Sequence, residues 1–402
     1  MEITVTIHNI CAYPNTINLI KRLNIETNAI KKAKLIRQAA LNKYSYLKRY
    51  RSISKAKTSI DETPTDIASS EKKNNTTSQV TVGISDIEHD EAYYVSIIVG
   101  NQKFRVILDT GSSTLWIPNN KCTDPDCKVH KRFNSRKSPT FKPEGKEWEI
   151  AYGTGSAAGI TGKDNIQIGN LTAIKQIFGL ANSVDDFFTK VVSDGIIGLA
   201  FDELNPMDNG APTFISTLIK QKTIDPIFSF HFQHFNDSND KGTFTLGGVD
   251  KSKFEGKITF TPVISSAENN GFWVINLEDV NVNDYSLKFS REAIIDTGTT
   301  LLIIPDGDAA AIHKKIPGSS FNEKQNLYII PCNTTAVVSL KFGGVNYEIP
   351  SRYLTFDKLS KSQCISGIQT GLDFWLVGQT FIKNVYSAFD VGRKKVGFAH
   401  SK

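Results

Sequence analysis

Residues 109–118 are Asp109-Thr-Gly-Ser-Ser-Thr-Leu-Trp-Ile-Pro118, and they align without a gap on Asp296-Thr-Gly-Thr-Thr-Leu-Leu-Ile-Ile-Pro305. Both copies contain Asp-Thr-Gly, then two hydroxyl residues, then an Ile-Pro at the same offset. A given Asp-Thr-Gly is expected about 0.1 times in a chain of this length at average residue frequencies. Two matching copies therefore indicate an internal repeat, with one aspartate in each half.

A second pair of matching glycines extends the repeat. Gly198 follows two isoleucines and lies 89 residues after the first aspartate, and Gly378 follows Leu-Val and lies 82 residues after the second. We therefore expect two lobes of similar build, at 81–250 and 251–402, preceded by a separate segment at 1–80.

The texture of the chain after residue 50 is that of a mostly β protein. Short apolar runs are bounded by Gly, Asn, Asp or Pro, and long segments of helical periodicity are scarce. Residues 93–99 and 104–108 flank a Gly100-Asn101 turn, which predicts a hairpin whose second strand ends at Asp109.

Charge separates the first 80 residues from the rest. They contain 14 Lys and Arg against six Asp and Glu, whereas the remaining residues contain 33 against 35. A solvated basic tail or a nucleic-acid-binding arm would fit the first segment, but the opposite signs favour a segment that docks on the acidic remainder. Residues 16–51 have helical spacing, and 52–80 have the composition of a flexible linker.

The chain has 402 residues, of which 40% are hydrophobic, enough for a large core. No apolar run approaches the roughly 18 residues that a membrane-spanning helix needs, so none is predicted. Residues 1–20 show neither the apolar core nor the cleavage site of an ordinary signal peptide. Either the start is misassigned or truncated, or export is unconventional.

Five cysteines bear on the compartment. Cys122 and Cys127 bracket a short polar loop, Cys332 and Cys364 lie 32 residues apart, and Cys11 stands alone. We expect two disulfides, which implies an oxidising compartment, with free buried thiols as the alternative. The spacing is poor for zinc and His231 and His234 would face opposite sides of a strand, so no metal site is predicted.

Two aspartates at the seam of two lobes predict a specific chemistry. Gly111 and Gly298 permit tight turns that leave each carboxyl pointing out of the turn. Carboxyls within about 3 Å of each other cannot both ionise, so they share one proton and can hold a water between a base and an acid. Ser112 and Thr299 are placed to donate hydrogen bonds to the carboxylates, and Thr110 and Thr297 to tie the two loops together.

Four motifs make the chain resemble the pepsin family of eukaryotic aspartic proteases, which includes cathepsin D and nematode digestive proteases. Residues 106–118 resemble the first active-site strand and loop, 150–156 the flap, 194–200 the central motif, and 293–299 the second active-site loop. The resemblance runs from about 87 to 399. It implies a bilobal, mostly β acid protease fold with a deep inter-lobe cleft and a β-hairpin flap.

The resemblance also implies a function. Asp109 and Asp296 would be the catalytic pair of an endopeptidase that works at acid pH without cofactor or metal and prefers large hydrophobic residues around the cut. The implied substrate-binding residues are Tyr152, Gly153, Thr154, Trp116, Ile107, Phe187, Ile196 and Thr300. The aromatic often found before the central Asp-Gly is Ser193 here, and Gln379 stands where Asp is common.

The basic N-terminal segment resembles a prosegment, most clearly at Lys34-Leu-Ile-Arg37 and Tyr46-Leu-Lys48. Its Lys and Arg would pair with carboxylates near neutral pH, and acid would protonate those carboxylates and release it. We expect autoactivation by cleavage between Ser52 and Asp90. The resemblance further implies polypeptide substrates, inhibition by pepstatin-type compounds, a monomer, no nucleic-acid partner, and a secreted or lysosomal/vacuolar location.

Two other hypotheses stay open at this point. A catalytically inactive relative could bind peptides, although both Asp-Thr-Gly triplets are intact. A glycosidase also uses paired carboxylates, although it has no reason to repeat Asp-Thr-Gly followed by a hydroxyl residue. Proteolysis that depends on the second aspartate separates the endopeptidase from both.

Overall fold

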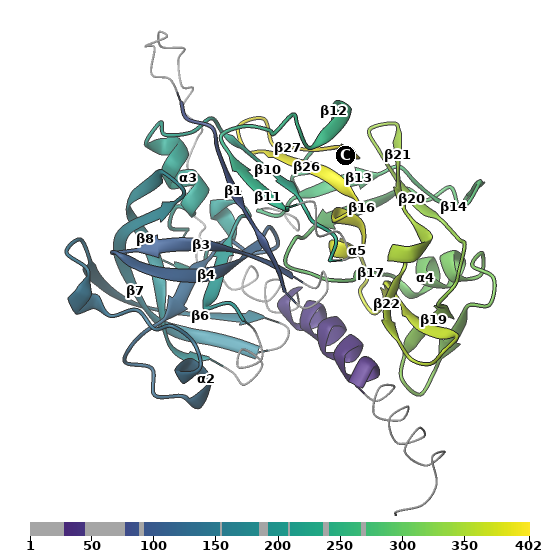
Figure 1. Cartoon of the computed structure of the whole chain (residues 1–402), viewed down its shortest axis with the longest axis horizontal. Helices are drawn as coiled ribbons and strands as arrows, with labels where there is room; N and C mark the ends of the chain where they lie inside the picture. The colour runs from purple at the N-terminus through teal and green to yellow at the C-terminus, as the bar shows by residue number, and fades with distance from the viewer. Residues whose placement is uncertain are drawn as a thin grey trace, which may run out of the picture.

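The computed structural model describes residues 28–44, 77–87, 92–152, 155–184, 192–207, 210–235, 241–266 and 271–402. Strands dominate, and they form two lobes with a helix lying between them (Figure 1). This confirms the predicted mostly β, bilobal fold. The predicted helical region at 16–51 is helical at 28–44, and its remaining residues lie outside the described ones.

One eight-stranded sheet builds the first lobe, in the order β2-β3-β4-β9-β5-β8-β7-β6. Its strands are β2 (Ser85–Ile87), β3 (Ala92–Val99), β4 (Gln102–Asp109), β5 (Leu115–Pro118), β6 (Lys142–Tyr152), β7 (Gly155–Ile168), β8 (Leu171–Val184) and β9 (Gly195–Gly198).

The predicted hairpin that carries the first aspartate is confirmed as β3 and β4, paired from Val99 and Gln102 outward. Gly100 and Asn101 connect them with φ values of 49° and 68°. Two positive φ values are what a tight turn between right-twisted strands needs, and Gly and Asn accept them at low cost. The hairpin therefore delivers Asp109 at the end of β4.

The second lobe contains three smaller sheets, ordered β13-β16-β25-β17-β24, β15-β14-β20-β21 and β18-β19-β23-β22. Their strands are β13 (Val274–Leu277), β14 (Asp279–Val282), β15 (Tyr285–Ser286), β16 (Arg291–Ile295), β17 (Leu302–Ile304), β18 (Ser320–Asn322), β19 (Leu327–Pro331), β20 (Val338–Phe342), β21 (Val345–Ile349), β22 (Thr355–Lys358), β23 (Gln363–Ser366), β24 (Ile368–Thr370) and β25 (Trp375–Val377).

The sequence repeat has a counterpart in strand topology. In the first lobe β4 runs parallel to β9, and β9 runs antiparallel to β5. In the second lobe β16 runs parallel to β25, and β25 runs antiparallel to β17. Each aspartate thus stands at the end of a strand, β4, or directly after one, β16. The strand that runs parallel to it contains the matching glycine in the first lobe, β9, and directly precedes that glycine in the second, β25.

A six-stranded sheet, ordered β1-β11-β10-β26-β27-β12, contains strands from both halves of the chain (Figure 1). Its strands are β1 (Val80–Gly83), β10 (Ile227–His231), β11 (Thr243–Leu246), β12 (Phe254–Pro262), β26 (Val385–Asp390) and β27 (Lys395–Ser401). Pairing of β10 with β26 joins the two lobes across this sheet.

Short helices and two disulfides complete the described fold. The helices are α2 (Pro125–Lys128), α3 (Phe214–Lys220), α4 (Asp306–His313) and α5 (Gln379–Ile382), with 3₁₀ turns η1 (Ser135–Lys137), η3 (Asp202–Leu204) and η5 (Ser351–Tyr353). The two expected disulfides are present, Cys122–Cys127 and Cys332–Cys364.

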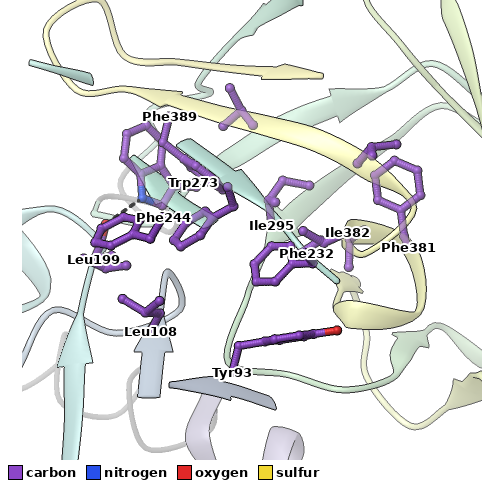
Figure 2. Packing of buried hydrophobic residues seen from close by; sticks show 14 of the residues in the cluster. Tyr93, Leu108, Leu199, Phe232, Phe244, Trp273, Ile295, Phe381, Ile382 and Phe389 are labelled. Carbon is purple, nitrogen blue, oxygen red and sulfur yellow. Dashed lines mark hydrogen bonds between the residues drawn. The ribbon is translucent and has the colours of Figure 1, made fainter. Parts of the chain in front are cut away.

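Trp273 packs where the two lobes meet, in a cluster with Phe389 and Phe244 (Figure 2). The indole is fully buried, and its Nε1 donates to the carbonyl of Leu199 at 2.9 Å. The backbone carbonyl of Trp273 accepts from Ile295, the last residue of β16, at 3.0 Å. One residue, through its backbone carbonyl and its indole, therefore ties the strand before the second aspartate to the segment after β9.

Replacing Trp273 with Phe should lower the free energy of unfolding by about 1–3 kcal/mol, because the buried Leu199 carbonyl loses its donor. Trp148→Phe is the matched control, since its indole donates at 3.1 Å to a part-buried carbonyl, that of Ile160, which water can reach more easily. Chemical denaturation should show the larger loss for Trp273→Phe. Equal losses would contradict the importance of the lobe-joining bond.

Candidate active site

The two repeated turns meet face to face at the seam. Asp109 and Asp296 are 2% and 0% exposed, so both carboxyls are buried. A β-carbon added to Gly111 would lie 2.4 Å from Cγ of Asp296, and one added to Gly298 would lie 2.3 Å from Oδ1 of Asp109. Each glycine therefore lets the backbone of one lobe touch the carboxyl of the other, which no larger residue would allow.

Each carboxylate is held by its own loop in the same way. The backbone N–H of Gly111 and the hydroxyl of Ser112 donate to the first aspartate at 3.0 and 2.5 Å. The backbone N–H of Gly298 and the hydroxyl of Thr299 donate to the second at 2.9 and 2.6 Å. Hydrogen bonds to both oxygens fix the plane of each carboxyl, so the pair is preorganised.

Thr110 and Thr297 join the loops by a reciprocal set of hydrogen bonds. The N–H of each threonine donates to the hydroxyl of the other, at 3.0 and 2.9 Å. Each hydroxyl then donates across the seam, Thr110 to the carbonyl of Ile295 and Thr297 to that of Leu108, both at 2.8 Å. Because all four bonds are buried and paired, they set how the lobes approach each other.

Lys43 lies near the end of the helix at 28–44, which runs between the two lobes (Figure 1). Its Nζ lies 2.8 Å from Oδ1 of Asp109 and 3.1 Å from Oδ2 of Asp296. The hydroxyl of Tyr44 donates to Oδ2 of Asp296 at 3.0 Å. The helix therefore covers the carboxyl pair with one ammonium and one phenol.

The predicted prosegment motifs, at 34–37 and 46–48, lie on either side of Lys43 and Tyr44, which were not predicted as site residues. A signal was present in the spacing of small and apolar residues along the helix. Those buried or packed against the body are Ala29, Ile30, Ala33, Ile36, Ala40, Leu41 and Tyr44. This stripe follows helical periodicity and ends at Tyr44, so a cation beside its end was the candidate partner for two buried carboxylates.

Arg37 anchors the same helix by a different kind of contact. Its guanidinium donates to the backbone carbonyls of Thr370 and Asn326, the latter at 3.0 Å. Thr370 in turn donates its hydroxyl to Asp306. Burial lowers the pKa of Arg37 despite the nearby Asp306. Its guanidinium holds the helix through the two backbone carbonyls.

The electrostatics of the pair are asymmetric. Burial raises the pKa of Asp109 to about 6, against the opposing influence of the Lys43 ammonium. Burial acts in the same direction on Asp296, but Lys43 and hydrogen bonds from Asp109 and Thr299 hold its pKa below the ordinary value. Burial disfavours the charge on Lys43, yet the two carboxylates raise its pKa. While Lys43 is in place, Asp109 thus has the higher pKa of the two carboxyls.

Three of the predicted substrate-binding residues lie in one apolar cluster of the first lobe. Trp116, Ile107 and Ile196 share it with Trp148, whose ring centroid is 6.2 Å from that of Trp116. Thr300 accepts hydrogen bonds at its carbonyl from Thr380.

The flap is confirmed as a hairpin of β6 and β7, in which Tyr152 pairs with Gly155. The side chain of Tyr152, together with Gly153, Thr154 and Phe187, lies outside the described residues.

Within the described ranges, no group of three His, Cys, Asp or Glu side chains is arranged to hold a metal ion. His231 contacts the hydroxyl of Ser401 at 2.8 Å, and His234 stacks on Tyr353. Among the same residues, no helix is long and apolar enough to cross a membrane.

Gly298→Ala should destabilise the chain, because its β-carbon would collide with the carboxyl of Asp109. Gly307→Ala is the matched control, since nothing lies within 4 Å of its added carbon and the position is helical. Alanine there should stabilise the chain by up to ~1 kcal/mol. Thermal unfolding should therefore shift in opposite directions, and a harmless Gly298→Ala would contradict the close approach of the loops.

Comparison with known proteins agrees with this geometry. A family model described as "Eukaryotic aspartyl protease" matches residues 92–401. The chain is 37% identical over 315 residues to an aspartic protease of Phaffia rhodozyma, covering 75% of each chain.

Two further relatives extend the comparison. The chain is 36% identical over 305 residues to a probable aspartic-type endopeptidase of Arthroderma otae, covering 74% of this chain and 78% of the relative. It is 33% identical over 337 residues to cathepsin D of Dictyostelium discoideum, covering 79% and 85%. The chain is thus an aspartic-type endopeptidase and belongs to the eukaryotic aspartyl protease family.

Proposed function

We propose that the chain hydrolyses internal peptide bonds of polypeptides at acid pH, with Asp109 and Asp296 as the catalytic pair. The observation that carries this proposal is the symmetric burial of two carboxyls that face each other and are hydrogen-bonded by their own loops. Buried like charges favour one shared proton, so the pair offers a base and an acid at the same place.

The reaction needs a water between the carboxyls once Lys43 has withdrawn. The position of its Nζ, within hydrogen-bond reach of both carboxylates, supports a water at that point. The ionised carboxylate takes a proton from the water, and the water oxygen attacks the scissile carbonyl carbon. At the same time the protonated carboxyl donates a hydrogen bond to the carbonyl oxygen. The resulting diol collapses, the amide nitrogen receives a proton, and an amine and a carboxylic acid leave.

A preference for large hydrophobic residues around the cut is proposed from the chemistry of the site wall. Trp116, Ile107 and Ile196 form apolar surface in the lobe that carries Asp109. Apolar substrate side chains would bury surface against them at about 25 cal/mol per Å². Tyr152, Gly153, Thr154, Phe187 and Thr300 are proposed to complete the substrate-binding surface.

The helix at 28–44 is proposed to act as an intramolecular inhibitor. It covers both catalytic carboxyls, and its ammonium lowers their affinity for protons. When the helix leaves, the carboxyls lose that cation and bind protons more tightly. By linkage, acidification therefore favours the released state, and neutral pH favours the covered one.

Strand β1 supports a cut upstream of Thr77, within the wider interval from Ser52 to Asp90. The N–H of Ser78 donates to the carbonyl of Thr223 at 2.9 Å, and Thr77 donates its hydroxyl to Asp225 at 2.8 Å. Because β1 already pairs with β11 at the edge of the six-stranded sheet, a cut beyond it would remove a sheet strand. The activated enzyme is therefore proposed to retain Thr77 onward.

The compartment and the binding partners of the chain are also proposed. Two disulfides support an oxidising compartment, and relatives named cathepsin D and aspartic protease support a secreted or lysosomal/vacuolar location. The activated chain is proposed to work as a monomer and to bind pepstatin-type inhibitors in the same site.

Asp296→Asn should abolish proteolysis, because an amide cannot serve as the base or share the proton. Haemoglobin digestion at about pH 4, with and without pepstatin, should show a loss of at least ~10²-fold for the mutant and near-complete inhibition of the wild type. Asp306→Asn is a control that changes the same functional group outside the catalytic pair. Undiminished cleavage by Asp296→Asn would refute the proposed mechanism.

Lys43→Met should shift acid activation of the full chain toward neutral pH by ~1 unit, because the helix loses the attraction that depends on ionised carboxylates. Wild-type activation should begin as pH falls through the Asp109 pKa of about 6. Lys34→Met removes the same charge from an exposed position of the same helix and should leave the profile unchanged. Mass and activity would be followed together, and identical profiles for both variants would exclude Lys43 as the acid-sensitive contact.

A further inference from the structure

Gln379 is buried beside the second active-site loop, at the first position of α5 and directly after Gly378. Its side-chain Nε2 donates to the carbonyl of Thr297 at 2.8 Å, and its backbone N–H donates to the carbonyl of Thr299 at 2.7 Å. One residue is therefore hydrogen-bonded to the loop of Asp296 at two points.

The residues next to Gln379 make further hydrogen bonds to the same loop. The N–H of Asp296 donates to the carbonyl of Val377 at 3.0 Å, and the N–H of Thr380 donates to that of Thr300 at 2.8 Å. A β-carbon on Gly378 would lie 2.3 Å from the carbonyl oxygen of Thr299, so the two backbones are in close contact. Of these hydrogen bonds to the loop backbone, the one to the carbonyl of Thr297 comes from the side-chain amide of Gln379, and the others come from backbone N–H groups.

The two lobes differ at this point. Leu199 follows Gly198 as Gln379 follows Gly378, and a leucine side chain offers no donor. The backbone of the first lobe is still held, since Leu199 donates to the carbonyl of Asp109 at 2.8 Å and Ala200 to that of Ser112 at 2.8 Å. The amide of Gln379 is thus an addition to the second lobe beyond the shared backbone pattern.

The bond from Gln379 acts on a residue that also contacts the other lobe. Thr297 donates its hydroxyl to the carbonyl of Leu108 and its N–H to the hydroxyl of Thr110. With its own carbonyl held by Gln379, every polar group of Thr297 has a partner. A change at Gln379 can therefore alter the spacing between the two carboxyls without touching either.

Resting on the proposed function, we propose that Gln379 is a positioning residue that holds the second active-site loop and thereby sets the separation of Asp296 from Asp109. The amide carries no charge, so it holds the loop equally at every pH at which the enzyme works. Its Oε1 is buried without a hydrogen-bond partner among the described residues, so the amide is retained at the cost of an unpaired acceptor.

Apart from Asp109 and Asp296, ionisable groups near α5 lie on the strands packed against it and on the helix at 28–44. The strands packed against α5 are β17, β21, β25 and β26. Their ionisable side chains are Asp390, which pairs with Arg393, Tyr386, which contacts Ser229, Tyr347, which donates to the carbonyl of Phe398, and the exposed Glu348. On the side of the cleft, Lys43 and Tyr44 face the pair until the helix is removed.

The test replaces Gln379 with Met, which keeps the length of the side chain and removes the donor. Gln176→Met is the matched control, because Gln176 is also buried, also donates from Nε2 to backbone carbonyls, and also has a buried Oε1 without a partner in the described part of the chain. Its partners, Ile177 and Pro212, belong to the first lobe, and neither is a residue of the two active-site loops.

Full-length variants would be acid-treated, their active sites counted by titration with pepstatin, and kcat and KM measured per titrated site across the pH range. Gln379→Met should lower kcat about tenfold with little change in KM, since a hydrogen bond to the loop is lost. Carboxyls that are held less closely interact less, so the two limbs of the bell-shaped pH profile should move toward each other by ~0.5 unit. Gln176→Met should lower the melting temperature and leave the width of the profile unchanged.

An unchanged pH profile for Gln379→Met, with only a lower melting temperature, would show a purely structural role and overturn the inference. A wild-type chain without activity would instead refute the proposed function. If Gln379→Met yields no titratable sites, Gln379→Asn carries the same prediction, because its amide is one methylene too short to keep the bond to Thr297.

Discussion

Two carboxyl groups buried against each other at the seam of two lobes are the constraint on which the rest of this structure depends. Burial disfavours their charge, and each disfavours the charge of the other. Asp109 and Asp296 are nevertheless held together, because each accepts hydrogen bonds from its own loop at both oxygens. The crossed bonds of Thr110 and Thr297 then prevent the loops from separating.

The helix at 28–44 offsets the same unfavourable charge in another way. The ammonium of Lys43 is buried between the carboxyls, and a buried charge is tolerated when it is paired. Tyr44 and the apolar stripe behind it pack against the second lobe, so the cation arrives on a rigid support. The two carboxyls, whose affinity for a proton the reaction needs, are thus also the groups that an intramolecular cation can bind.

Much of this arrangement could be predicted because it is written in local patterns. The repeat of Asp-Thr-Gly indicated two lobes, the Gly100-Asn101 turn indicated the hairpin before Asp109, and the cysteine spacing indicated two disulfides. Lys43, Trp273 and Gln379 were not predicted as parts of the seam. Their partners lie 66 or more residues away, as with Lys43 and Asp109, and no periodic pattern in one sequence identifies the partner of a contact at that separation.

The central claim is that the two carboxyls act as one unit that shares a proton. The most direct test compares kcat/KM for Asp109→Asn, Asp296→Asn and the double mutant, each normalised to folded protein. Residues that act together are not additive, so the double mutant should be no less active than either single mutant. If the two single losses instead multiply in the double mutant, the carboxyls act independently and the account is wrong.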